Sequence, residues 1–300
     1  MTSLATARRT GLPTRGHNRR RTLAPYAFLA APMAFFAVLF FYPLVQELIT
    51  SFYTGPRADQ FAGVSNFTRA FADANMRHSF VVTFEFAAGT LVFSILIGLV
   101  LAAMLNARLK GSVIFRGILL VPYLTSIAIV GLLWRNILDP QVGVLNRLLV
   151  AAHLPTQTWL NTSPVATIVF IAVWQQVGYT TLLFLAGMQG IPESYYEAAK
   201  VDGASPWQRF WRVTLPLLAP TTLFVSVIGV ISSLQEFALP YLVTNGGPGD
   251  ATSLYVFRLY DVAFTFRDFG YASALSYLML IVILILSAIQ LRIGRRDHGE

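Results

Sequence analysis

Long apolar segments constrain this chain more than any other feature of its sequence. They reach about 20 residues, the length at which a helix crosses the hydrocarbon core of a bilayer. Only 12% of the residues are charged, whereas a soluble globular domain carries about 25%. We therefore predict an all-α integral membrane protein with six transmembrane helices, at residues 24–49, 79–105, 113–134, 165–188, 215–237 and 271–291. Pro122 interrupts the third of them.

The basic residues predict how these helices are oriented. Short loops rich in Arg and Lys face the cytoplasm in membrane proteins. Most of the 22 basic residues fall into the two tails and into the second-to-third and fourth-to-fifth connections. Both termini are therefore expected in the cytoplasm, as an Arg-rich tail at 1–23 and a short tail at 292–300, on either side of a membrane domain at 24–291. The residues concerned are Arg8, Arg9, Arg15, Arg19, Arg20, Arg21, Arg108, Lys110, Arg116, Lys200, Arg209, Arg212, Arg292, Arg295 and Arg296.

Two other interpretations of the basic residues are less consistent with their positions. A net charge of +8 suits a nucleic-acid partner, but these residues follow the membrane rim, so we expect membrane lipid as a partner and no nucleic acid. Arginines before an apolar run also resemble a secretory signal. The run that starts at residue 24 is longer than a typical signal core, and we interpret it as the first transmembrane helix.

The sequence has none of the residue sets that would make it an enzyme. It contains no cysteine, which excludes disulfides and thiol catalysis, and its four histidines lack metal-ligand spacing. A phosphate-binding P-loop requires glycines before its lysine, and neither Lys110 nor Lys200 has them. We expect the chain itself to bind no metal and no cofactor.

The connection at 190–214 has the signals of two short helices joined by a turn. Pro192 suits the opening of the first helix, and Gly203 suits the left-handed residue that ends it. Ser205 followed by Pro206 has the pattern of an N-cap and a first-turn proline. Trp207, Phe210 and Trp211 then fall on one helix face. That face is suited either to docking a partner or to packing against the membrane helices.

This connection resembles the EAA loop of binding-protein-dependent ABC importer permeases. The matching residues are Glu197-Ala198-Ala199, Asp202-Gly203 and Leu215-Pro216, whereas Thr214 stands where the family often has an aliphatic residue. The resemblance implies that the loop couples the permease to a separate ATPase subunit, which would carry ATP and Mg. The coupling residues that it implies are Glu197, Ala198, Ala199, Asp202, Gly203, Trp207, Phe210, Leu215 and Pro216.

A second stretch narrows the resemblance. Residues 242–248, Leu-Val-Thr-Asn-Gly-Gly-Pro, and residues 270–274, Gly-Tyr-Ala-Ser-Ala, are similar to carbohydrate-uptake permeases related to the maltose transporter. This similarity implies a type I ABC importer permease fold in a bacterial plasma membrane, with sugar imported by alternating access. It also implies a second homologous permease subunit, two ATPase subunits and an extracellular solute-binding protein as partners.

Polar residues inside the predicted helices are the candidates for substrate binding. Charges within a membrane are costly and often functional, which directs attention to Glu47, Glu85 and Glu236. For Glu85 we favour a hydrogen bond between helices. Gln235, Glu236 and Tyr241 could bind and stack on a sugar, as could Trp174, Gln175 and Tyr179 in the fourth helix, unless these polar groups only join helices.

Two alternatives for the function remain open. Importers of glycerol phosphate or phosphodiesters have permeases that closely resemble those for sugars, but an anionic solute would favour arginine near the path, and Glu236 argues mildly against it. A secondary transporter or channel would work without any ATPase. A membrane enzyme is disfavoured because no catalytic set is present.

Overall fold

The computed structural model describes residues 19–55, 58–107 and 111–296 of the chain and divides into two units, 1–49 and 50–300. The first unit is a continuous helical rod, formed by α1 (Arg19–Phe36), the π-helical segment η1 (Ala37–Phe41) and α2 (Tyr42–Thr50). Within it, Phe28–Thr50 is long and apolar enough to cross a membrane and buries no side chain. The predicted first transmembrane helix coincides with this segment. Of the predicted tail at 1–23, residues 1–18 lie outside the described residues, and residues 19–23 belong to α1.

The second unit begins with a small hairpin that the all-helical prediction did not include. Strand β1 (Tyr53–Thr54) pairs antiparallel with β2 (Gln60–Phe61). Helix α3 (Ser65–Ala72) follows, and its Asn66 side chain donates hydrogen bonds to the carbonyls of Ser51 (2.9 Å) and Tyr53 (2.8 Å). Asn66 is buried, and these two bonds give its NH2 group the partners that a buried donor needs. They also fix the hairpin to α3.

Two long helices, α4 (Ala74–Asn106) and α9 (Pro164–Gln189), pack along each other at the centre of the second unit. The Asp73 side chain caps α4 by accepting hydrogen bonds from the N–H groups of Asn75 and Met76. The helices approach closely because Gly98 faces Thr180, where any Cβ would lie 2.7 Å from the Thr180 methyl carbon. With α15 (Phe269–Arg296), these helices coincide with the predicted second, fourth and sixth spans and are long and apolar enough to cross a membrane.

The third and fifth predicted helices are each broken by a bend, where the sequence predicted one helix. Helix α5 (Ser112–Leu124) meets α6 (Ile127–Ile137) at 92°. Thr125 and Ser126 are extended between them, one turn after Pro122, which offers no N–H to the helical ladder. Helix α13 (Ala219–Leu234) is likewise bent by 62° from the segment Pro206–Leu217.

Proline also explains the second break. Pro220 lies in the first turn of α13 and has no N–H for the carbonyl of Pro216, so the ladder stops between them. The segment before the break consists of α11 (Pro206–Arg209), the π-helical η2 (Phe210–Thr214) and α12 (Leu215–Leu217). By length and composition, the described residues provide four helices that could span a membrane, or up to six if each bent pair is one span.

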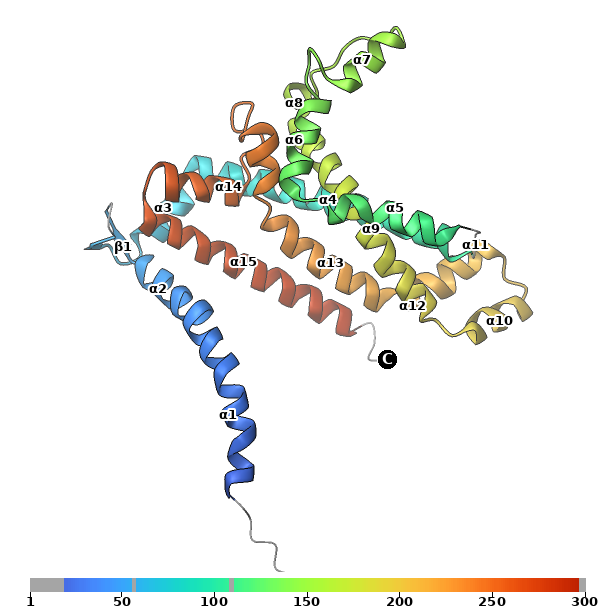
Figure 1. Cartoon of the computed structure of the whole chain (residues 1–300), viewed down its shortest axis with the longest axis horizontal. Coiled ribbons are helices and arrows are strands. Elements are labelled where there is room, and N and C mark those ends of the chain that lie inside the picture. The colour runs from blue at the N-terminus through green and yellow to red at the C-terminus, as the bar shows by residue number, and fades with distance from the viewer. Residues whose placement is uncertain (1–18, 56–57, 108–110, 297–300) are drawn as a thin grey trace, which may run out of the picture. The chain divides into compact units, whose positions relative to one another are not determined.

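The remaining elements lie at the two ends of the long helices of this unit (Figure 1). An arm beyond α6 carries α7 (Val144–Ala151) and α8 (Trp159–Thr162), and the buried Asn146 joins its parts by bonding to Pro140 and Gln157. The other segments are α10 (Glu193–Val201), η3 (Pro240–Thr244), α14 (Tyr255–Tyr260) and η4 (Asp261–Thr265).

Three apolar clusters form the core of the second unit along α4, α9 and α15. The largest fully buried side chains in them include Phe86, Ile168, Phe184, Leu218 and Tyr271. Tyr271 also donates a hydrogen bond to Asp73 (3.0 Å), and the guanidinium of Arg69 lies 4.0 Å above its ring. Arg69 forms an ion pair with Asp268, so α3, the start of α4 and the start of α15 are held together by polar contacts as well as packing.

Candidate functional site

The loop at 190–214 folds as two short helices, as its sequence predicts. Pro192 directly precedes α10, and Gly203 ends it in the left-handed conformation with φ of +76°. The N–H of Gly203 donates to the carbonyl of Lys200, and that of Ala204 to Ala199, which closes the helix end. Ser205 and Gln208 then form a reciprocal capping box at the start of α11. Local signals therefore determine the shape of this loop.

An aromatic cluster lies on the second of these helices. The rings of Trp207, Phe210 and Trp211 are within 6.4 Å of one another, measured between centroids. Trp207 is 69% exposed and Trp211 is 49% exposed, whereas Phe210 is half-buried. The predicted common face is confirmed, and in this chain it is largely uncovered.

Most of the residues for which we predicted a coupling role are accessible on this loop. Glu197, Ala198, Asp202, Gly203 and Trp207 are exposed, as is Pro216 on α12. Ala199, Phe210 and Leu215 are half-buried and attach the loop to the rest of the unit.

Thr214, which departs from the family pattern, has a clear structural role. Its hydroxyl is buried and lies 3.0 Å from the hydroxyl of Tyr196 on α10. An aliphatic side chain at 214 would leave the Tyr196 hydroxyl without this partner. The pair links α10 to η2 and so fixes the angle between the two halves of the loop.

A cavity of about 370 Å³ lies where both broken helices approach the middle of α9. Gln175 and Gln176 come from α9, Gln235 and Glu236 follow the end of α13, and Tyr123 lies at the end of α5. The other lining residues are Ile127, Phe237 and Ala238. Among the described residues, the lining combines three amides, one carboxylate and two aromatic rings and contains no cation.

The breaks between α5 and α6 and after α13 explain why a polar cavity lies here. Non-helical backbone is tolerated at membrane depth only where it is buried in protein or lines a water-filled cavity. Residues 125–126 and 235–237 are the non-helical stretches here, and the Gln235 side chain is exposed. Glu236 accepts a hydrogen bond from the N–H of Leu239 (2.9 Å), which orders the chain beyond α13. Interrupted helices of this kind surround the substrate in many transporters.

The structure brings some of the predicted substrate residues together and separates others. Gln175, Gln235 and Glu236 line the same cavity. Tyr179 lies beside it, stacked on Tyr123. Tyr241 is on η3 and stacks on Phe237, with ring centroids 5.0 Å apart.

Trp174 does not line the cavity. Its ring packs against Trp134, 5.4 Å away at 80°, within an apolar cluster. Glu85 differs from expectation as well, because its side chain is exposed on α4 and makes no hydrogen bond within the described residues. The predicted bond from Glu85 to a neighbouring helix of this chain is therefore wrong.

Sequence reasoning did not find Tyr123 and Ile127 as cavity residues. They line it because α5 ends between them and the chain turns sharply. Pro122 was the available signal, since a proline within a membrane helix frees backbone groups that need water or protein partners. The residues beside such a proline could have been named on that ground.

Comparison with known proteins agrees with this geometry. Residues 94–296 match the family described as binding-protein-dependent transport system inner membrane component. The chain is 33% identical to the sn-glycerol-3-phosphate transport system permease protein UgpA of Brucella abortus, covering 92% of this chain and 96% of the relative. It is 34% identical to the arabinooligosaccharides transport system permease protein AraP of Bacillus subtilis, covering 92% and 90%.

A solved structure has the same fold. A chain of a bacterial alginate ABC transporter, crystallised with its alginate pentasaccharide-bound periplasmic protein, superimposes with a TM-score of 0.80 at 22% identity, over 93% of this chain and 96% of that one. The fold is thus that of type I ABC importer permeases. This chain belongs to the family of inner membrane components of binding-protein-dependent transport systems. It is a multi-pass membrane protein and a transport permease subunit.

Proposed function

We propose that this chain is one of two permease subunits of an ATP-driven importer that carries a sugar, from a mono- to an oligosaccharide, into a bacterial cell. The observation that carries the proposal is the cavity at the two helix breaks. Amides and a carboxylate can bind sugar hydroxyls, and aromatic rings can stack on sugar faces. Gln175, Gln235 and Glu236 supply the polar groups, while Tyr123 and Phe237 supply the rings.

The topology that we propose has six membrane spans, with each bent pair counted as one, and both termini in the cytoplasm. The loop at 190–214 is then cytoplasmic, and its exposed Trp207 and Trp211 are free to enter a groove on an ATPase subunit. ATP and Mg would be bound by that subunit. A solute-binding protein would deliver the sugar from outside. The complex of the alginate transporter with its pentasaccharide-bound periplasmic protein supports this part of the proposal.

Glycerol 3-phosphate is the second candidate solute, because the UgpA relative is named for it. A phosphate ester carries negative charge and is best bound by arginine or by helix N-termini. The cavity instead presents Glu236 and has no cation among its lining residues. The arabinooligosaccharide relative is equally similar in sequence, and the chemistry of the cavity favours a sugar.

Reconstitution tests this proposal directly. The chain is placed in proteoliposomes with its permease and ATPase partners, and labelled mono-, di- and oligosaccharides and glycerol 3-phosphate are offered with the solute-binding protein. We expect ATP-dependent uptake of a sugar. Uptake of glycerol 3-phosphate alone would establish the second candidate, and uptake that persists without the ATPase would indicate a secondary transporter.

Substitutions connect that uptake to the cavity. Gln235→Ala removes an amide from the lining, and Glu236→Gln replaces its carboxylate by a neutral amide; each should lower sugar-stimulated ATPase activity several-fold. Gln157→Ala is the matched control, because Gln157 bonds to Asn146 through its backbone and lies outside the cavity. Equal activity of all three variants would remove these residues from the path.

A further inference from the structure

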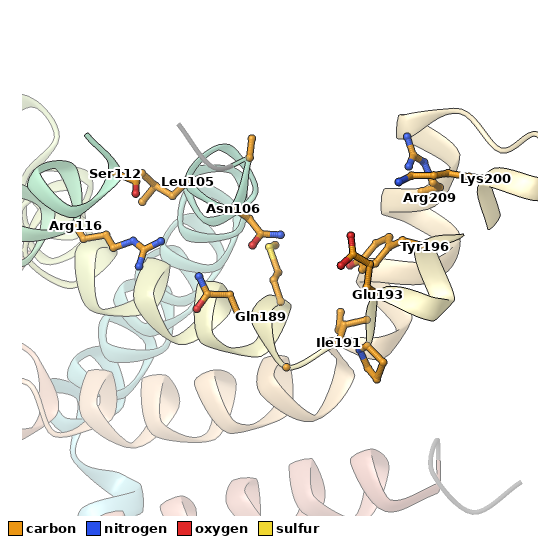
Figure 2. A pocket seen from close by; sticks show the side chains of 14 residues that line it. Leu105, Asn106, Ser112, Arg116, Gln189, Ile191, Glu193, Tyr196, Lys200 and Arg209 are labelled. Carbon is orange, nitrogen blue, oxygen red and sulfur yellow. The ribbon is translucent and has the colours of Figure 1, made fainter. Parts of the chain in front are cut away.

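A second and larger cleft lies at the C-terminal end of α9, away from the proposed sugar cavity. Its volume is about 1130 Å³. One wall is formed by the end of α4, the start of α5 and the end of α9, and the other by α10 and Arg209 of α11. Figure 2 shows the two walls and the side chains between them.

Cations occupy both walls of this cleft. Arg116 extends from the α5 wall, and Figure 2 shows the nitrogen-bearing ends of Lys200 and Arg209 on the opposite side. Glu193 is the one carboxylate among the lining residues. The cleft therefore carries an excess of positive charge.

These cations have no ion-pair partner within the described part of the chain. Among the described residues the only ion pair joins Arg69 to Asp268, far from the cleft in sequence. The Nε atoms of Arg116 and Arg209 are buried and donate no hydrogen bond in the described chain. Both side chains are only partly buried, and a guanidinium has terminal N–H groups besides its Nε. An anion that enters the cleft would pair with these terminal N–H groups.

Neutral donors complete the lining. The side-chain amides of Asn106 and Gln189 lie near Arg116, and Ser112 adds a hydroxyl. A phosphate group has several strong acceptor oxygens and binds arginine through paired hydrogen bonds. Basic pockets at the cytoplasmic ends of membrane helices also receive lipid phosphate groups. The set of donors therefore fits a phosphate better than a neutral solute.

We propose that this cleft is a binding site for a phosphate-bearing ligand, held by Arg116 on one wall and by Lys200 and Arg209 on the other. Because α10 and α11 form the second wall, a bound phosphate would draw them toward the ends of α4 and α5. The ligand would thus stabilise one position of the loop at 190–214. The site is separate from the sugar cavity, and its existence does not depend on which solute is transported.

Binding of pyrophosphate to the assembled transporter tests the proposal. The complex is assembled with ATPase subunits whose P-loop lysine is substituted so that their nucleotide sites bind no phosphate. It is placed in nanodiscs of phosphatidylcholine and titrated calorimetrically with pyrophosphate in the absence of nucleotide. We expect saturable binding to the wild-type complex that weakens as salt is added. The double variant Arg116→Gln/Arg209→Gln should bind at least tenfold more weakly. Arg212→Gln is the matched control, because it removes a nearby charge that does not line the cleft, and its affinity should change less than twofold.

Nanodiscs that contain phosphatidylglycerol distinguish the two sources of phosphate. If the affinity for pyrophosphate is lower in these nanodiscs than in phosphatidylcholine nanodiscs, and the double variant shows no such difference, the lipid phosphate is the ligand. An unchanged affinity would identify a soluble phosphate-bearing ligand. The proposal is overturned if the assembled wild-type transporter shows no saturable binding, which is the result expected if the ATPase fills the cleft. It is also overturned if Arg212→Gln weakens binding as much as the double variant does.

Discussion

The rings of Tyr123 and Tyr179 stack almost in parallel, with centroids 4.5 Å apart and an angle of 6° between their planes. Tyr123 lies in the last turn of the broken helix α5, and Tyr179 lies one turn beyond the cavity residue Gln175 on α9. The stack therefore attaches the break in α5 to a continuous helix. It also orients Tyr123 as a wall of the proposed sugar cavity.

Loss of this stack should impair transport. Tyr123→Ala removes an aromatic pair, which is worth about 0.5–1.5 kcal/mol beyond its buried area, and it removes one wall of the cavity. We expect sugar uptake in proteoliposomes to fall several-fold. Tyr123→Phe keeps the ring and should retain most of the uptake. If both variants transport at the wild-type rate, the stack has no part in forming the path.

The close crossing of α5 and α9 should not tolerate a side chain at Gly178. A Cβ there would collide with the backbone carbonyl of Leu119, and overpacking of this kind costs about 1–3 kcal/mol. Gly178→Ala should lower the melting temperature of the purified transporter. Gly117→Ala on α5 meets no atom within 4 Å and should leave that temperature unchanged or raise it slightly, since Ala favours a helix over Gly.

The hydroxyl pair of Tyr196 and Thr214 should be measurable by a double-mutant cycle. A hydrogen bond of this kind contributes about 1 kcal/mol. Tyr196→Phe and Thr214→Val should each destabilise the protein, and the double variant should lose less than the sum of the two single losses. Strict additivity of the changes in thermal stability would mean that the two hydroxyls are not coupled.

The aromatic face of the loop at 190–214 should matter for coupling and not for folding. Trp207 is 69% exposed, so Trp207→Ala removes little packing within this chain. We expect normal membrane insertion and melting temperature, with ATPase activity that no longer responds to sugar and binding protein. Phe264→Ala is a suitable control, because Phe264 is 62% exposed on η4, away from the loop. A coupled transporter carrying Trp207→Ala would contradict the role that we propose for this face.

Much of the fold follows from local sequence signals, and the failures have a common cause. Long apolar runs predicted the straight spans, and Gly203 with Ser205 predicted the shape of the loop at 190–214, because both effects act over a few residues. The bends of 92° and 62° could not be predicted. A proline shows where a helical ladder is weakened, but packing against other elements determines whether and how far the chain turns.

The candidate site was predictable only in part for the same reason. Gln235 and Glu236 were found because polar groups are rare within apolar runs. Tyr123 was missed because its place in the lining depends on the break in α5. Trp174 was predicted to bind substrate together with its polar neighbours on α9, but its ring packs against Trp134. Helix periodicity could not show which face of α9 meets α6.

Single-cysteine labelling is the most direct test of the account, because the chain contains no cysteine. Val201→Cys places a thiol at the end of α10, where the side chain is 87% exposed, and Val142→Cys places one in the arm before α7, where it is 61% exposed. We predict that a membrane-impermeant maleimide labels Val142→Cys in spheroplasts and labels Val201→Cys only after permeabilisation, and that Val201→Cys forms cross-links to the ATPase subunit. Labelling of Val201→Cys from outside intact spheroplasts would contradict the account.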